Sequence, residues 1–226
     1  MKARPVLLVL ALLAPAIGPA AEAATRPRPK PVCQIIKDAP GDATYNNVPG
    51  DGNDDIVSGD LASDGRTVTG VLRLAALAQP DPAAPLGQAF FVRFSPRGSD
   101  KLLFLSARTF PSGTTYSFGY SADDPNTGIN TSYTLGAAKG VVDSAKKEVR
   151  VTVPVTAFKA AGVSLVKGLK LLTPTAETYR IVGQGVVPSQ EVGPARVPLG
   201  GVLLPFDEAS GAAYVVGTPS CARPVT

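Results

Sequence analysis

The sequence predicts an all-β protein, namely an antiparallel β-sandwich of jelly-roll type with one short helix. Short apolar runs recur along the chain and are separated by turn residues, since 23 glycines and 22 prolines occur among 226 residues. Several runs alternate with period two, and in residues 148–153 Val149, Val151 and Val153 share one side. Alternation of this kind is typical of half-buried antiparallel strands.

The clearest single element is a hairpin that begins at residue 56. Its strands are predicted at 56–63 and 67–75, with a tight turn at Asp64 and Gly65 between them. Further strands are expected at 88–95, 101–108, 114–120, 131–135, 148–153, 169–173, 179–182, 202–204 and 213–216.

Helix is scarce in this sequence. Residues 155–161 are predicted to form about two helical turns, because Pro154 precedes them and Gly162 suits a C-terminal cap. The chain shows no internal repeat and no second domain boundary. Residues 33–226 are therefore expected to form a single β-sandwich domain.

Residues 1–23 are typical of a secretory signal peptide. Lys2 and Arg4 precede an apolar core over 6–17, and a small-x-small cleavage site follows at 21–23. That core is too short to span a bilayer, and no transmembrane span is expected elsewhere. The sequence thus predicts a secreted, extracellular protein, with an uncleaved anchor as the alternative.

The two cysteines lie near the two ends of the predicted domain. Residues 24–32 form a proline-rich, basic linker, and Cys33 follows it directly, whereas Cys221 lies close to the C-terminus. An exported protein meets oxidising conditions, and the termini of a domain are often close in space. A disulfide between Cys33 and Cys221 is therefore predicted, with two separate buried thiols as the alternative.

Composition excludes several kinds of chemistry. The chain has no histidine, which excludes a Ser-His-Asp triad and a zinc site with histidine ligands. The net charge of +4 includes no dense basic run, so no nucleic-acid partner is expected. Paired carboxylates or a Ser-Lys dyad remain as enzyme options, but a protein without catalytic activity is predicted.

An acidic, glycine-rich segment stands out in this basic chain. Seven aspartates and no lysine or arginine lie between residues 38 and 64. The pattern Asp51-x-Asn53-x-Asp55 resembles the opening of a calcium loop, since calcium prefers six to eight oxygen ligands. Calcium is predicted as a cofactor, and the expected ligands are Asp38, Asp42, Asp51, Asn53, Asp55 and Asp60.

The segment is not an EF-hand. Ile56 stands where an EF-hand has its turn glycine, and Ala62 stands where it has its bidentate glutamate. The alternative to a calcium site is a solvated acidic loop, because Asp, Asn and Gly are common in turns.

Tyrosines are the candidates for stacking on a sugar. Tyr116 and Tyr120 are the predicted ligand-binding residues, and Tyr45 and Tyr133 are further candidates. The chain has no tryptophan, which would provide a stronger platform. The alternative is that these tyrosines are half-buried neighbours of a core that contains Phe118.

Residues 38–43 (DAPGDA) and 54–65 (DDIVSGDLASDG) are followed by a Val/Leu-rich strand. This order resembles the start of carbohydrate-binding-module family 9-like and DOMON-like β-sandwiches of exported bacterial proteins. Residues 149–154, with a helical turn after them, are similar to a later strand of that fold. The resemblance implies a non-catalytic antiparallel sandwich that is often stabilised by calcium. The sugar-clamping tryptophans of family 9 modules have no counterpart here, and the haem ligation of some DOMON relatives cannot be carried over without histidine.

These observations predict an exported, non-catalytic binding module that is stabilised by calcium. Its expected partner is a glycan or another component of the cell envelope, and its oligomeric state is not predicted. One alternative is a structural or interaction protein without affinity for sugars, which the absence of tryptophan favours. The other is a carboxylate-dependent hydrolase.

Overall fold

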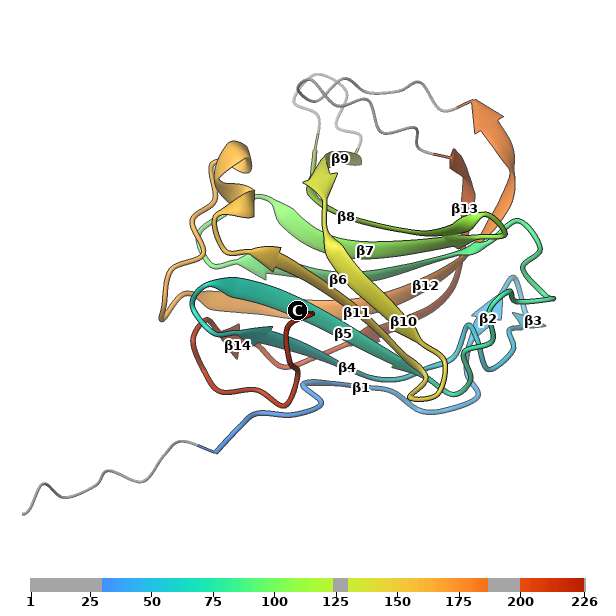
Figure 1. Cartoon of the computed structure of the whole chain (residues 1–226), viewed down its shortest axis with the longest axis horizontal. Helices are drawn as coiled ribbons and strands as arrows, with labels where there is room; N and C mark the ends of the chain where they lie inside the picture. Colours follow the sequence, from blue (N-terminus) through green and yellow to red (C-terminus); the bar gives the residue numbers. More distant parts are fainter. Residues whose placement is uncertain (1–29, 124–129, 187–199, 226) are drawn as a thin grey trace, which may run out of the picture.

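The computed structural model describes residues 30–123, 130–186 and 200–225. Within these ranges the chain folds as two antiparallel sheets packed face to face, with the termini of the described part on the side of the smaller sheet (Figure 1). The all-β sandwich predicted from the sequence is confirmed. The predicted signal peptide, and the linker up to residue 29, lie outside the described residues.

The smaller sheet has five strands in the order β1-β4-β5-β11-β10. These are β1 (Ile36–Lys37), β4 (Ile56–Ser63), β5 (Thr67–Leu74), β11 (Glu148–Pro154) and β10 (Lys139–Asp143). The predicted hairpin is confirmed as β4 and β5, and Gly65 in its turn has φ +82°, which favours glycine. Strands β1 and β10 were not predicted, because two to five residues carry little periodicity.

The larger sheet follows the order β13-β12-β6-β7-β8-β9. It contains β13 (Gly200–Ser210), β12 (Lys170–Val186), β6 (Gln88–Pro96), β7 (Leu102–Phe110), β8 (Gly113–Asp123) and β9 (Asn130–Ala137), and β14 (Tyr214–Val215) also pairs with β12. A separate two-stranded ribbon joins β2 (Thr44–Tyr45) to β3 (Val48–Pro49).

Two of the strand predictions merge into one strand. The segments 169–173 and 179–182 were predicted as separate strands, but both belong to β12. The apolar pattern breaks between them because β12 has a register shift against β6 between Leu172 and Thr175, where Thr173 adopts φ +40°. The predicted helix is a 3-10 helix, η1 (Ala157–Ala161), and Gly162 caps it with φ +76°.

The core lies between the two sheets. Strand β6 contributes Phe90, Val92 and Phe94, and β11 contributes the three valines that alternate in the sequence. A Cβ added at Gly70 of β5 would lie 2.9 Å from Cβ of Val92, so this glycine allows the two sheets to approach closely. No helix in the part of the chain that the structure describes is long and apolar enough to cross a membrane.

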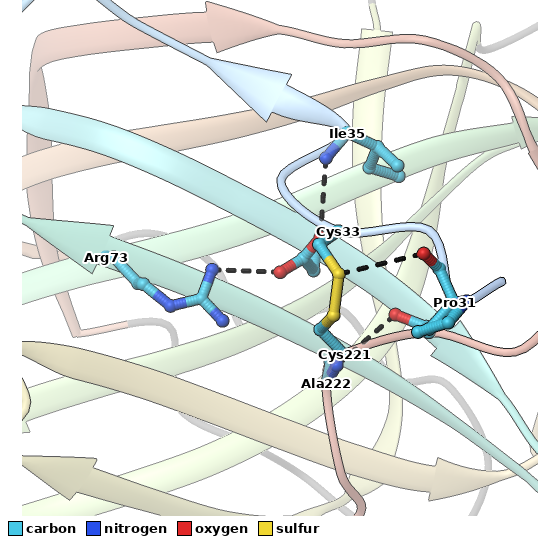
Figure 2. Close-up of a disulfide and its surroundings, with 8 residues drawn as sticks. Pro31, Cys33, Ile35, Arg73, Cys221 and Ala222 are labelled. Atoms are coloured by element: carbon cyan, nitrogen blue, oxygen red, sulfur yellow. Dashed lines mark hydrogen bonds and ion pairs between the residues drawn. A yellow bond between two sulfur atoms is a disulfide. The ribbon is translucent and has the colours of Figure 1, made fainter.

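The two ends of the domain are joined beside β4. Cys33 and Cys221 form the predicted disulfide, with Cα atoms 5.1 Å apart (Figure 2). The amide of Val32 donates to the carbonyl of Pro219 at 2.8 Å, and the amide of Cys221 donates to the carbonyl of Val32 at 3.2 Å. Backbone pairing therefore begins at Val32, inside the predicted linker.

Removal of the disulfide is expected to lower the stability of the protein substantially. The bond links residues that are 188 positions apart, and the chain-entropy estimate for such a loop is about 5 kcal/mol. The double variant Cys33→Ala/Cys221→Ala should therefore unfold at clearly lower guanidinium concentration than the oxidised wild type. Equal unfolding midpoints would contradict this role, and mass spectrometry without reductant checks that the wild type carries no free thiol.

Candidate functional site

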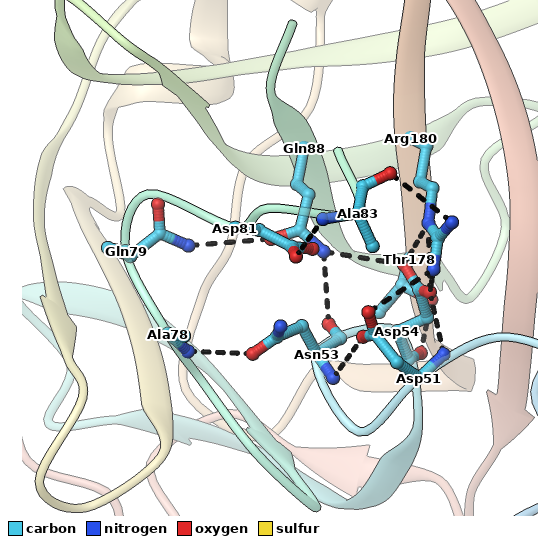
Figure 3. Close-up of polar contacts among 10 residues, drawn as sticks. All are labelled: Asp51, Asn53, Asp54, Ala78, Gln79, Asp81, Ala83, Gln88, Thr178 and Arg180. Carbon is cyan, nitrogen blue, oxygen red and sulfur yellow. Dashed lines mark hydrogen bonds and ion pairs between the residues drawn. The ribbon is translucent and has the colours of Figure 1, made fainter. Parts of the chain in front are cut away.

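The acidic loop is attached to the larger sheet by a buried ion pair (Figure 3). The Asp54 carboxylate is fully buried, and Nε of Arg180 on β12 lies 3.2 and 3.0 Å from its two oxygens. A second guanidinium nitrogen of Arg180 also contacts Asp54, and it lies 3.5 Å from Asp51. This loop was predicted to carry uncompensated charge, but β12 supplies it with one cation.

Hydrogen bonds fix the backbone of the loop around this pair. The side-chain oxygen of Asn53 accepts from the amide of Ala78 at 2.6 Å, and the carbonyl of Asp54 accepts from the Thr178 hydroxyl at 2.6 Å. The Gln88 amide donates to the carbonyl of Asn53 at 3.3 Å. The loop is thus ordered by its own contacts with β6, β12 and the segment after β5.

The structure gathers aspartates into two clusters that could hold a metal ion. In each cluster, one carboxylate oxygen from every member lies within 4.8 Å of the others. Two oxygens that bind one calcium ion at 2.3–2.6 Å are at most about 5 Å apart, so the spacing fits calcium. The two clusters contain Asp38, Asp42 and Asp207, and Asp51, Asp54 and Asp81.

Three of the predicted calcium ligands lie outside both clusters. The Asn53 side chain is bound to a backbone amide, as described above. The Asp55 carboxylate accepts from the amide of Gly41 at 2.8 and 2.9 Å. Asp60 lies on β4, where it pairs with Arg73 at 2.9 Å and accepts from the amide of Ile35 at 3.3 Å.

Three members of the clusters were not predicted. Asp54 lies within the predicted motif, but its side chain points to Arg180. Asp81 and Asp207 come from the segment before β6 and from β13, so only the tertiary fold places them near the loop. Nothing in the local sequence around Asp81 or Asp207 marks them as members of such a cluster.

The aspartate clusters contain carboxyl groups with raised pKa values. Burial raises the pKa of Asp207 to about 6, and the neighbouring charges of Asp38 and Asp42 add to this rise, although the amide of Ile56 donates to Asp207 at 2.7 Å and opposes it. Burial also raises the pKa of Asp81, which is 4% exposed, and one of its oxygens has no hydrogen-bond partner. A bound cation would offset the negative charge of both carboxylates and would therefore lower their pKa values.

The predicted sugar-stacking tyrosines point toward the core side of β8. The ring of Tyr116 lies against Gly140, where an added Cβ would come within 2.0 Å of it. Tyr120 stacks on Tyr133 with ring centroids 5.0 Å apart, and both Tyr116 and Tyr120 pack against the core. This half-buried arrangement corresponds to the alternative weighed for these tyrosines.

A second polar region was not predicted from the sequence. We use "outer face" for the side of the larger sheet that is turned away from the smaller sheet. The outer face can be identified from the alternation in β6, where Phe90, Val92 and Phe94 point into the core and the residues between them point away from it. Its members are Ala89, Phe91, Arg93, Phe104, Ser106, Arg108, Ser117, Ser121, Glu177 and Tyr179.

Aromatic rings on the outer face support charged side chains. Phe91 makes edge contacts with Phe104 and Tyr179, with centroids 5.8 and 5.5 Å apart. The Arg93 guanidinium lies 4.6 Å from the Phe91 centroid and pairs with Glu177 at 2.8 Å. Because the two phenylalanines are almost fully buried, the groups that remain partly accessible are the arginines and Tyr179.

Hydroxyl groups complete the outer face. The Ser106 and Ser117 hydroxyls lie 2.8 Å apart, and the Ser121 hydroxyl accepts from Arg93 at 3.2 Å. The Tyr179 hydroxyl donates to Glu177 at 2.6 Å, and burial, together with the charge of this carboxylate, raises the pKa of the phenol. The sequence signal was Arg93, the single charged residue in the otherwise apolar run 89–94, which could have indicated a polar side.

No protein-family model matches the chain, and no curated protein matches it. Among solved structures, it is similar to a crystal structure of a Bacteroides uniformis protein that is provisionally described as carbohydrate-binding. The likeness covers 84% of this chain and 81% of that chain, at 14% identity and a TM-score of 0.38. A TM-score this low carries no argument about function, and the resemblance to family 9-like and DOMON-like sandwiches stays a prediction.

The raised pKa of Asp207 predicts that stability falls as pH rises. Its pKa increases from 3.8 in the unfolded chain to about 6 in the folded protein, so its stabilising contribution is complete below pH 3.8 and is lost as pH rises through 6. In the presence of a chelator, the urea midpoint should decline over this window, and Asp207→Asn should flatten the decline. The asparagine can still accept from the amide of Ile56.

Asp143→Asn is the control for this prediction. Lys146 holds the pKa of this partly exposed carboxyl below its ordinary value, so its titration affects stability only at lower pH. A decline that is equally steep in wild type and in Asp207→Asn would contradict the assignment.

Proposed function

We propose that the protein is a secreted, non-catalytic binding module that recognises a glycan or another envelope component through the outer face. The observation that carries this proposal is that Arg93, Arg108, Tyr179 and Ser117 stay partly accessible above the buried aromatic rings of Phe91 and Phe104. Such a face offers fixed hydrogen-bond donors and acceptors to a ligand that is rich in hydroxyl groups. Strands on both sides hold these groups in place, so little side-chain freedom is lost on binding.

Calcium binding to the aspartate clusters is the second part of the proposal. The support is the spacing of the carboxylate oxygens, the raised pKa values and the buried oxygen of Asp81 that lacks a partner. The two clusters differ in whether a basic side chain of the protein already neutralises part of their charge. Asp54 already pairs with Arg180, whereas none of Asp38, Asp42 and Asp207 forms an ion pair with a lysine or arginine of the described residues.

The two alternative functions, a structural protein and a hydrolase, can each be tested. A structural protein without sugar affinity would bind none of the saccharides tested below. A carboxylate-dependent hydrolase would use Asp207 as a general acid, since its pKa of about 6 suits that role. However, the oxygens of Asp38, Asp42 and Asp207 lie within 4.8 Å of one another, which is closer than the carboxylates of retaining or inverting glycosidases. Hydrolysis of chromogenic glycosides that disappears in Asp207→Asn would establish this alternative.

Glycan binding, where it occurs, is expected to depend on the outer face. On a glycan array, Tyr179→Phe removes one hydroxyl from this face and should weaken binding several-fold, because the carboxylate of Glu177 loses a partner and changes its orientation. The originally predicted platform is tested by Tyr116→Phe and Tyr120→Phe, which keep the packing of both rings. If binding depends on Tyr116 and Tyr120 and not on Tyr179, the binding site lies on the core side of β8 and not on the outer face.

Calcium is expected to stabilise the protein measurably. A weak extracellular site has a dissociation constant of about 10⁻⁴–10⁻³ M, and 100-fold saturation adds about 2.7 kcal/mol of stability. The thermal midpoint should therefore rise by about 5–10 °C for a domain of this size. Magnesium should have a smaller effect, because it requires stricter octahedral geometry.

Two variants assign the calcium effect to one cluster. Asp42→Asn alters the cluster that includes Asp207, and Asp81→Asn alters the cluster that includes Asp54. The rise should disappear in one of them and persist in the other. Equal melting of chelator-treated and calcium-loaded wild type would leave the acidic segment as a solvated loop.

A further inference from the structure

Arg108 on β7 differs from the other partly buried arginines of the described residues. It pairs across the sheet with Ala89 of β6 and Thr115 of β8, so its side chain projects on the same side as these residues. Its guanidinium carbon lies 6.0 Å from the centroid of the Phe91 ring. The side chain is partly buried, and the aromatic ring beneath it restricts its position.

The Arg108 guanidinium has no anionic partner within the ranges 30–123, 130–186 and 200–225. Arg73, Arg93, Arg150 and Arg180 all form ion pairs with carboxylates there. Arg108 forms none, although a guanidinium offers five N–H donors. The buried carboxylate of the outer face, Glu177, is already bound to Arg93 and to the Tyr179 hydroxyl.

The electrostatics of this position favour an external anion. Burial lowers the pKa of Arg108, and the like charge of Arg93 lowers it further, but it stays fully protonated at neutral pH. Arg93 and Arg108 carry two positive charges on the outer face, and its negative charges include Glu177 and the exposed Glu208, which pairs with Glu177 across β12 and β13. Neither of these carboxylates forms an ion pair with Arg108. A partly desolvated cation without a partner gains more from a ligand anion than a solvated surface cation does.

The geometry points to an anionic saccharide as the ligand of the outer face, with a uronate carboxylate bound by Arg108. This inference rests on the proposed glycan-binding function and narrows its substrate class. The planar guanidinium matches a carboxylate with two parallel hydrogen bonds. Thr115, which is exposed, and Ser117, which is partly buried, follow on the neighbouring strand and offer hydroxyls to the same sugar residue.

The test uses the mature, disulfide-bonded protein and three uronate oligosaccharides, derived from homogalacturonan, alginate and hyaluronan. Each is titrated calorimetrically in its native form and as its methyl ester, which differs only in the lost charge. At least one native oligosaccharide should bind, and its methyl ester should bind about 10-fold more weakly or worse. Raising the salt from about 50 to 300 mM should also weaken binding, because the contact is electrostatic.

Matched variants assign the binding to Arg108. Arg108→Gln should weaken binding about 10-fold or more, and Arg108→Lys should give an intermediate loss because it keeps the charge without the planar fork. Arg97→Gln removes the same charge from the exposed turn between β6 and β7 and should change affinity less than about twofold. Arg108→Gln should not lower the thermal midpoint, since it breaks no ion pair within the described residues.

Three results would overturn the inference: no binding of any native uronate, equal binding of the methyl esters, or equal effects of Arg108→Gln and Arg97→Gln. Sulfated saccharides are titrated in the same way. If they alone bind, the anion bound by Arg108 is a sulfate ester and the uronate assignment is wrong. Neutral glycans that bind in the absence of uronate binding would leave the proposed function intact. If neither kind binds, both proposals fail together.

Discussion

The buried pair of Asp54 and Arg180 is the interaction on which the acidic side of this protein depends. It joins the loop before β4 to the middle of β12, the long strand that lies between β13 and β6 in the larger sheet. Loss of one partner from such a pair typically costs about 3–5 kcal/mol, because the other charge is left buried and unpaired. The Arg180 guanidinium also lies 4.2 Å from the ring of Phe206, so β13 is attached to the same centre.

This pair also explains why the surrounding aspartates fall into two chemically different clusters. The cluster around Asp54 has an internal cation and a backbone that is fixed by hydrogen bonds, so its unsatisfied group is the single oxygen of Asp81. The cluster around Asp207 has no lysine or arginine partner among the described residues, so protonation or an external ion would limit the repulsion between its carboxylates. The two clusters therefore differ in how their negative charge is compensated, although each takes two of its three members from the same acidic segment.

The sequence was sufficient for most of the fold, because alternation and turn residues are local signals. The hairpin of β4 and β5 was predicted from such signals, and the helical turn was placed within two residues of η1. The disulfide was predicted from the expected export of the chain and from the positions of its two cysteines near the ends of the domain. The candidate site was harder to predict from the sequence, since its members are brought together only by the tertiary fold. Asp60 was grouped with the loop because it is near in sequence, but β4 carries it to Arg73, whereas Asp81 and Asp207 reach the loop from distant segments. The outer face was missed because alternation identifies two sides of a strand without showing that arginines of neighbouring strands meet.

The disulfide makes the folded domain a covalently closed loop, because the bonded residues lie 188 positions apart and close to both ends. A single cut by an extracellular protease in any connection between Cys33 and Cys221 would leave both fragments attached at one point and packed in one core. The domain could thus be nicked without releasing the strands of the outer face. In the extracellular setting of the proposed function, this arrangement gives the fold a tolerance to backbone cleavage that non-covalent packing alone would not provide.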